Sequence, residues 1–230
     1  MLALMLFSLA IFFIGIKISD AFSPLVCTQR YKTIIAAGKN NQADYRNPFL
    51  SILGGLLEKD DQAAVFEKID WKVPKRKSVA LKDMCRLIDS VLRERQCFVT
   101  GLCDASLYSD SFAFQDPDVK VKGIESYSRG VNKLFDQKTS KMDVISVKVS
   151  TISENTITVT WRLEGKVNIG PGLGIKPYII YTDLVVDPNE NGLIVFQEDK
   201  FSIPGYDILL SALFPFLRPF LAPAALPIIE

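Results

Sequence analysis

One segment of the chain places a single carboxyl group among aromatic side chains at every second position. Tyr108, Asp110, Phe112 and Phe114 alternate with small residues, and this period of two predicts a β-strand with the four side chains on one face. Since three of the four are aromatic, we expect this face to point into an apolar interior. Desolvation raises the pKa of a buried carboxyl group, which can then act as a general base or as a neutral hydrogen-bond donor.

Three aromatic residues with a polar atom are candidates for lining the same interior. Tyr108, Tyr127 and Trp161 each join a hydrogen-bonding group to an apolar ring, a combination typical of ligand pockets. Together with Asp110 and Phe112 they form the predicted pocket, where Asp110 and a tyrosine hydroxyl could transfer protons. A plainer interpretation is favoured, in which Asp110 lies at the open mouth of the fold and contacts water or nearby backbone.

The composition excludes several kinds of catalytic site. The chain has no histidine, which removes Ser-His-Asp and Cys-His catalysis and histidine-ligated metals. Its four cysteines, at positions 27, 85, 97 and 103, form neither a CxxC pair nor a standard zinc spacing. We therefore expect no metal and no cofactor, and we interpret the cysteines as small buried apolar residues. A Cys97–Cys103 disulfide in an oxidising compartment is the alternative.

Hydrophobic periodicity predicts the elements that position these residues. Apolar residues at helical spacing predict a helix over residues 80–95 with Ser78 as its N-cap, and Gly123 opens a second helix that holds Tyr127. Alternating segments after it predict four strands, of which the second contains Trp161. These strands lie at 145–150, 156–164, 178–187 and 193–201. The order predicts an α+β fold, with helices packed on the concave face of one curved antiparallel sheet.

Short motifs in these elements resemble those of a known superfamily. They are Phe114-Gln115-Asp116-Pro117, then Val121-Lys122-Gly123-Ile124 with Tyr127, and later the segment 159–165. Their order and spacing resemble the nuclear-transport-factor-2-like (SnoaL-like) superfamily over residues 80–202. They are most similar to a branch from plants, algae and cyanobacteria that has no established activity.

This resemblance implies a cone-shaped α+β barrel with a cavity between helices and sheet. Members of the wider superfamily include isomerases, dehydratases, epoxide hydrolases and non-catalytic binding or dimerisation modules, so the fold transfers better than the function. The glycine-rich segment 170–174 departs from the relatives that the motifs indicate. The resemblance therefore does not predict the structure of the pocket rim at that point.

The first 47 residues predict where the protein goes. An apolar run over residues 2–16 is as long as a signal-peptide h-region and shorter than the ~20 residues that span a bilayer. Cleavage after residue 21 would leave Phe22 ahead of a basic, acid-poor segment at 22–47, which has transit-peptide composition. The signal peptide at 1–21 and the segment at 22–47 resemble the two-part leaders of algae with secondary plastids. We expect a plastid location, with secretion as the alternative.

The rest of the chain divides into three parts: a helical extension and linker at 48–77, the main domain at 78–204, and an apolar, proline-rich tail at 205–230. Four prolines, at 215, 219, 223 and 227, interrupt the tail and remove helical hydrogen-bond donors. A transmembrane helix is therefore not expected. We expect the tail to fold over the domain. A peripheral membrane contact through residues 208–230 is the alternative.

The charges nearly cancel, with 27 Lys and Arg against 26 Asp and Glu, so nucleic acid is not an expected partner. The sequence predicts a plastid, non-catalytic binding or scaffold module that binds a hydrophobic small molecule or a protein partner. One alternative is a cofactor-free isomerase, dehydratase or hydrolase that uses Asp110 with Tyr108 or Tyr127. Another is a membrane-associated assembly factor that docks through its tail. A homodimer is a further arrangement left open.

Overall fold

The structure is a computed structural model that describes residues 44–45, 69–169 and 172–228. The predicted signal peptide at 1–21 therefore lies outside the described residues, as does the predicted transit segment at 22–47 apart from residues 44–45. Most of the predicted helical extension, residues 48–68, lies outside them as well.

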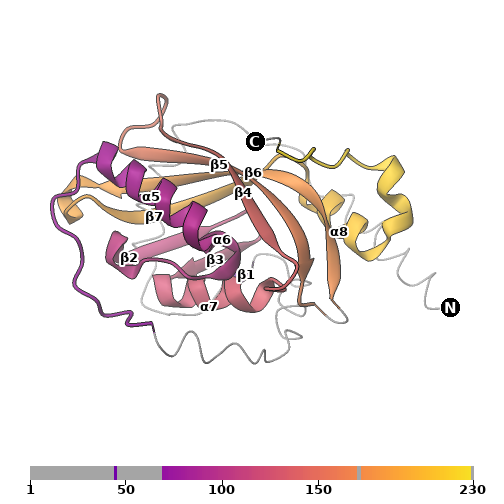
Figure 1. Ribbon diagram of the computed structural model, residues 1–230, viewed down its shortest axis with the longest axis horizontal. Helices are drawn as coiled ribbons and strands as arrows, with labels where there is room; N and C mark the ends of the chain where they lie inside the picture. Colours follow the sequence, from indigo (N-terminus) through magenta and orange to yellow (C-terminus); the bar gives the residue numbers. More distant parts are fainter. Residues whose placement is uncertain (1–43, 46–68, 170–171, 229–230) are drawn as a thin grey trace.

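One curved sheet of seven strands carries the fold, and it does not close into a barrel (Figure 1). The strands are β1 (Asp44–Tyr45), β2 (Tyr108–Gln115), β3 (Val119–Lys122), β4 (Lys141–Val149), β5 (Thr156–Val167), β6 (Leu173–Asp187) and β7 (Leu193–Phe201). Their spatial order is β1-β3-β2-β7-β6-β5-β4. The four predicted strands of the second half are confirmed as an antiparallel meander, β4 to β7.

The sheet is mixed, and the prediction of a purely antiparallel sheet is wrong in one place. Strand β2 runs parallel to β7, because a helix and four strands, β3 to β6, intervene and return the chain in the same direction. Alternation within a strand reports which face is buried and carries no information on the direction of its neighbour. Strand β3 was not predicted either, although its sequence, Val-Lys-Val-Lys, alternates; in the structure all four residues are half-buried.

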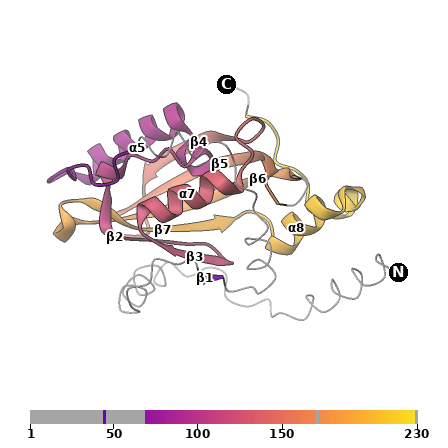
Figure 2. The same ribbon diagram turned by 90° about the horizontal axis from the view of Figure 1, so that it is seen from below.

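Helices α5 (Leu81–Arg95), α6 (Cys97–Thr100) and α7 (Ile124–Leu134) cover the concave face of the sheet (Figures 1 and 2). Both predicted helices are thus confirmed, together with the α+β class. Helix α7 begins after Gly123, whose φ of +82° is a conformation that favours glycine. The predicted cap of α5 is wrong: Ala80 occupies the N-cap position, and the chain turns earlier, at Ser78, where φ is +53°.

The core lies between these helices and the sheet. Strand β5 buries Ile157, Val159, Trp161 and Leu163, the face that its alternation predicts. Helix α5 buries an apolar stripe against the same core, formed by Met84, Ile88 and Leu92. Burying an aliphatic or aromatic side chain of this size stabilises the fold by about 1.5–3 kcal/mol.

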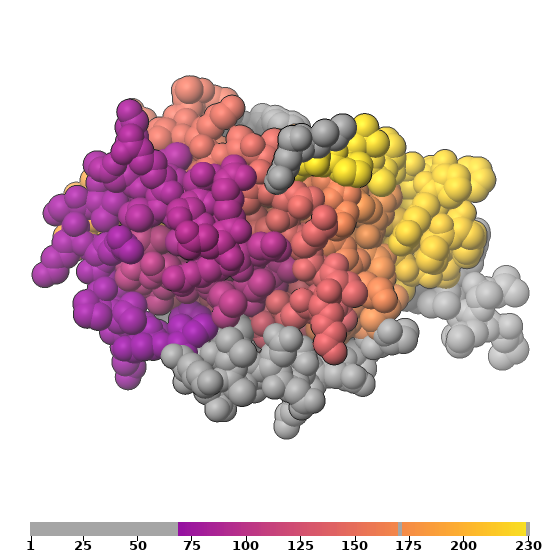
Figure 3. Space-filling model, viewed as in Figure 1, coloured from indigo at the N-terminus to yellow at the C-terminus, as the bar shows by residue number. Residues whose placement is uncertain are grey.

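The C-terminal segment forms a small layer of its own at one end of the molecule, coloured yellow in Figure 3. It consists of helix α8 (Gly205–Leu213), the 3-10 helix η3 (Pro215–Phe220) and an extended stretch that follows. Helix α8 packs against β6. Among the described residues, no helix combines the length and the apolar character that crossing a membrane requires.

Candidate functional site

The predicted interior position of Asp110 is wrong, because strand β2 contains an irregularity at this point. Tyr108 lies opposite Ile194 of β7, whereas Ala113 lies opposite Phe196, so β2 carries more residues than its partner over this stretch. Extra residues of this kind break the period of two. Asp110 and the residue after it both face solvent as a result.

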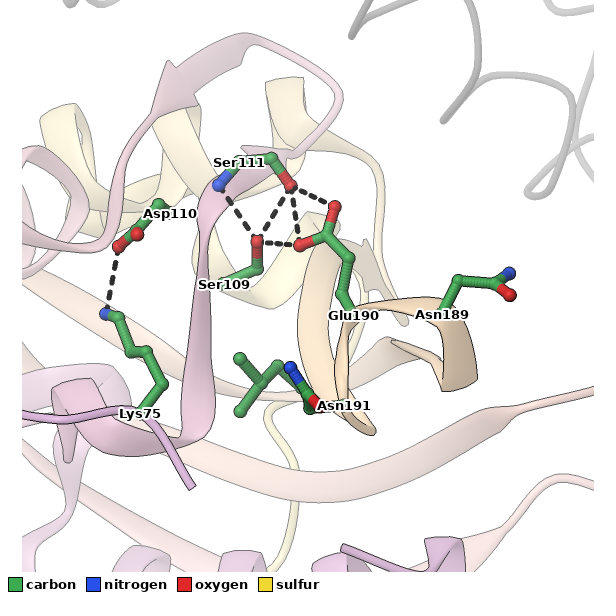
Figure 4. A pocket seen from close by; sticks show the side chains of 8 residues that line it. Lys75, Ser109, Asp110, Ser111, Asn189, Glu190 and Asn191 are labelled. Carbon is green, nitrogen blue, oxygen red and sulfur yellow. Dashed lines mark hydrogen bonds and ion pairs between the residues drawn. The ribbon is translucent and has the colours of Figure 1, made fainter. Parts of the chain in front are cut away.

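Asp110 instead forms part of a polar pocket on the surface (Figure 4). Its side chain is 93% exposed, and its Oδ1 lies 3.3 Å from Nζ of Lys75. This position matches the plainer of the two sequence interpretations. The pocket has a volume of about 460 Å³ and lies between the start of β2 and the β6–β7 connection. Its lining residues are Lys75, Ser109, Asp110, Ser111, Asn189, Glu190, Asn191 and Leu193.

The polar groups of this surface pocket largely satisfy one another. The Glu190 carboxylate accepts hydrogen bonds from the hydroxyls of Ser109 and Ser111, and Figure 4 shows these groups converging from β2 and the β6–β7 connection. Lys75 also donates to the Ala105 carbonyl at 3.1 Å. No tyrosine lines the pocket. The predicted pairing of Asp110 with a tyrosine hydroxyl is therefore not assembled here.

The other predicted pocket residues are buried together in the interior. Tyr108, Phe112, Tyr127 and Trp161 are all almost fully buried. The Phe112 ring centroid lies 5.0 Å from that of Tyr108 and 6.0 Å from that of Tyr127, whereas Trp161 packs on Phe98 at 5.7 Å. Aromatic pairs at these separations attract one another. The side chains expected to line a cavity thus pack against one another or, for Trp161, against Phe98, and they form part of the core of the concave face.

A chain of hydrogen bonds crosses this aromatic interior from β5 to α7. Trp161 Nε1 donates to Thr182 Oγ1 at 3.0 Å, and Thr182 donates to Asp199 Oδ1 at 2.7 Å. Gln197 Nε2 donates to the same Asp199 oxygen at 3.3 Å and to the Tyr127 hydroxyl at 3.0 Å. Asp199 on β7, and not Asp110, is therefore the carboxyl group that the fold places in the interior near a predicted tyrosine.

Burial changes the chemistry of Asp199. Desolvation raises its pKa to about 7, and the negative charges of Asp116 and Glu198 act in the same direction. The hydrogen bonds from Thr182 and Gln197 oppose this shift because they stabilise the carboxylate. Asp199 therefore exchanges its proton near neutrality.

Sequence reasoning missed Asp199 because it lies in a run of four polar residues, 197–200. Such a run is typical of a solvated strand end, and alternation cannot assign its faces. The only available signal was that residue 199 alternates with its neighbours and so shares one face of the strand with Gln197 and Phe201.

The two cysteines after helix α5 are free and buried, as the sequence interpretation expects. Cys103 Sγ lies 3.8 Å from the Cys97 carbonyl oxygen. The neighbouring Cys103 and burial both raise the pKa of Cys97 well above its usual value, so it stays a thiol. Among the described residues, no group of three or more acidic or cysteine side chains is arranged to hold a metal ion.

The C-terminal segment is fixed to the domain by a buried ion pair. Lys176 of β6 contacts the Asp207 carboxylate of α8, and both side chains are only 4% exposed. The Ala222 amide donates to Asp207 Oδ2 at 2.8 Å, and the Ala222 carbonyl accepts from Lys176 Nζ at 2.6 Å. We call Lys176, Asp207 and the Ala222 backbone the C-terminal clamp. This clamp confirms that the segment folds against the domain.

The clamped segment presents apolar side chains to solvent. Phe216 and Phe220 of η3 are 72% and 84% exposed, and Leu226 is 83% exposed. We call the exposed apolar side chains of this segment the C-terminal apolar surface. Its members are Tyr206, Leu213, Phe216, Phe220, Leu226 and Ile228.

Comparison with known proteins bears on the fold and not on an activity. The model of a family described as "uncharacterized conserved protein (DUF2358)" matches residues 83–196. No curated protein matches the chain.

Similar solved structures have NTF2-like and ketosteroid-isomerase-like folds. An NTF2-like protein of unknown function from Cytophaga hutchinsonii is 16% identical, with 55% of this chain and 94% of that chain covered and a TM-score of 0.35. Nuclear transport factor 2 from Cryptosporidium parvum is 16% identical, with 56% and 99% covered and a TM-score of 0.37. A ketosteroid isomerase-like protein from Catenulispora acidiphila, in complex with trimethylamine, is 12% identical, with 54% and 90% covered and a TM-score of 0.39. At these identities and scores the likeness indicates no ligand and no reaction.

Proposed function

We propose that the protein is a non-catalytic binding module that contacts its partner through the C-terminal apolar surface. The observation that carries this proposal is the exposure of Phe216 and Phe220, 72% and 84%, on a segment held by a buried ion pair. Aromatic side chains of this kind are typical anchors of binding interfaces.

The packing of the interior supports binding at an outer surface. The rings of Tyr108, Phe112 and Tyr127 contact one another where a cavity was expected, and Asp110 lies outside. A substrate would have to displace well-packed aromatic side chains to reach this region. Large losses of stability follow when such packing is disturbed, typically about 3–5 kcal/mol for a truncated Phe or Trp.

The energetics of the clamp point to the same surface. Removing two charges from water carries a desolvation penalty that their attraction only partly offsets, and Lys176 and Asp207 are nearly fully buried. The segment that they fix leaves large apolar side chains in water, although covering each would stabilise the system by about 1.5–3 kcal/mol. A partner that covers Phe216 and Phe220 would recover this free energy.

In this proposal the protein meets its partner in a plastid, as the predicted leader at 1–47 indicates. Fusion of residues 1–47 to a fluorescent protein tests the location. Fluorescence in the plastid is expected, and fluorescence in the medium would support the secretory alternative.

A photo-crosslinking experiment tests the binding proposal in extracts of cells that make the protein. The photoreactive residue p-benzoyl-phenylalanine replaces Phe220 in the full chain, and the matched control carries it at Ile152, which is 74% exposed on the β4–β5 turn. Covalent adducts, with protein or with lipid, are expected at position 220 and not at 152. Equal labelling at both positions, or none at 220, would contradict the proposal.

A second candidate function is a cofactor-free isomerase, dehydratase or hydrolase that works from Asp199. Two observations favour it: the pKa of Asp199 is raised to about 7 by burial, and Gln197 Nε2 links it to the Tyr127 hydroxyl. Gln197 Oε1 is also buried without a hydrogen-bond partner in the described part of the chain, so a donor group of a bound molecule could meet it.

Substrate screening with two variants tests this second function. Any turnover of hydrophobic epoxides or enones by the wild type should be lost in Asp199→Asn and kept in Asp110→Asn, because only Asp199 is buried with a tyrosine network. Turnover that persists in Asp199→Asn would exclude this assignment.

A further inference from the structure

We infer that the partner of the C-terminal apolar surface is the surface of a lipid bilayer, into which Phe216 and Phe220 insert. This inference rests on the proposed function and names the partner.

The described part of the segment carries few charges. Between residues 204 and 228 the only charged residues are Asp207 and Arg218. Asp207 is buried in the clamp. Arg218 donates from Nε to the Ser211 carbonyl and from Nη2 to the Gly174 carbonyl, both at 3.0 Å. A protein interface usually has a polar rim and about one hydrogen bond per 100–200 Å², whereas the acyl boundary of a bilayer favours a surface with few polar groups.

The backbone of the segment is also prepared for an environment poor in water. An unpaired backbone N–H costs several kcal/mol in hydrocarbon, and four prolines, at 215, 219, 223 and 227, lack this group altogether. Several of the remaining donors are paired: the amides of residues 214, 217, 221, 222 and 225 bond to backbone carbonyls or to the clamp. The segment therefore combines exposed apolar side chains with five paired amides and four positions that have no amide donor.

The position of the segment suits insertion into a surface. The 3-10 helix η3 lies at one end of the molecule (Figures 1 and 3), and its Phe216 and Phe220 are largely exposed to solvent. The clamp holds this end in one conformation before contact, so little conformational entropy is lost on insertion.

The expected affinity is modest and depends little on lipid charge. Full burial of a phenylalanine strengthens partitioning by roughly 10- to 150-fold, so Phe216 and Phe220 together support reversible association. A single myristoyl chain gives binding of the same reversible kind. Since the described part of the segment has one cation without an acidic partner, Arg218, whose guanidinium bonds to backbone carbonyls, anionic lipid should strengthen its binding by no more than about fivefold.

The test uses purified full-length chain and vesicles of phosphatidylcholine alone, or with one-third phosphatidylserine. The photoreactive residue at position 220 is expected to give adducts with lipid acyl chains in both kinds of vesicle, and the residue at position 152 is expected to give none. Because the leader is present in both chains, any membrane contact that it makes is the same for the two positions.

A flotation measurement supplies the affinity. The affinity for vesicles that Phe216 and Phe220 provide should fall by at least about 100-fold in the double variant Phe216→Ser/Phe220→Ser. The Ile152→Ser variant should keep the affinity of the wild type. Lipid adducts that are absent at 220, or as frequent at 152, would overturn the inference.

The two proposals can fail separately. Protein adducts at 220 in cell extracts without lipid adducts in vesicles would reject the bilayer and keep the binding function. The absence of adducts at 220 in both experiments would reject both.

Discussion

The buried carboxyl group of Asp199 should make the stability of the protein fall as the pH rises. Asp199 has a pKa of about 7 in the folded chain, against an ordinary value of 3.8. Between these two values the folded chain holds a proton that the unfolded chain has released. Unfolding is then favoured by a higher pH, because stability falls with pH wherever the folded state binds more protons.

The size of the effect follows from the difference between the two pKa values. A difference of about 3 units corresponds to ~4 kcal/mol at 1.36 kcal/mol per unit. The loss should begin near pH 4, grow up to about pH 7, and stay constant at higher pH. Replacing Asp199 by Asn removes the ionisation, while the amide oxygen can still accept hydrogen bonds from Thr182 and Gln197.

Urea unfolding followed by circular dichroism, at intervals from pH 4 to pH 9, measures this effect. The quantity of interest is the free energy of unfolding of Asp199→Asn minus that of the wild type. It should rise by up to about 4 kcal/mol between pH 4 and pH 8. The control is Asp110→Asn, whose side chain is 93% exposed, and its difference from the wild type should be flat. A flat or falling difference for Asp199→Asn would refute the reasoning.

Three further predictions concern stability, measured by urea unfolding at neutral pH. Lys176→Met leaves the Asp207 carboxylate buried without its cation and should cost about 3–5 kcal/mol, whereas replacing both residues by apolar ones should cost much less; equal losses would contradict a buried ion pair. Gly192→Ala should cost more than Gly123→Ala, by at least ~1 kcal/mol: both have positive φ, but only at 192 would a new Cβ lie 2.3 Å from a backbone oxygen. Trp161→Phe removes the indole donor of the interior chain and should cost about 1–3 kcal/mol; a neutral result would show that this hydrogen bond contributes nothing.

Local patterns predicted the elements well where the strands are regular. The face of β5 that holds Trp161 was identified from alternation alone, because a sheet covered on one side imposes a period of two on its sequence. Gly123 marked the start of α7 for a similarly local reason, since its positive φ suits glycine. These features depend on a few neighbouring residues, so the sequence reveals them directly.

The candidate site was predicted less well because it depends on contacts between distant segments. Alternation placed Asp110 in the interior, but the irregular pairing of β2 with β7 turned it to the surface, beside Lys75. Asp199 entered the interior instead, through a register that pairs it with Thr182 on β6. Neither register can be predicted from the sequence of one strand, since each is set by how two strands pair.

The sequence by itself determined the α+β class, the helices on either side of β2, the four-strand meander and the apolar character of the C-terminal segment. The tertiary structure alone decided that β2 runs parallel to β7, which carboxyl group is buried, and that Lys176 and Asp207 clamp the tail. The physical reason is the separation along the chain over which each kind of interaction acts. Periodicity and backbone preference act between neighbours, whereas desolvation and ion pairing depend on which distant segments the fold brings together.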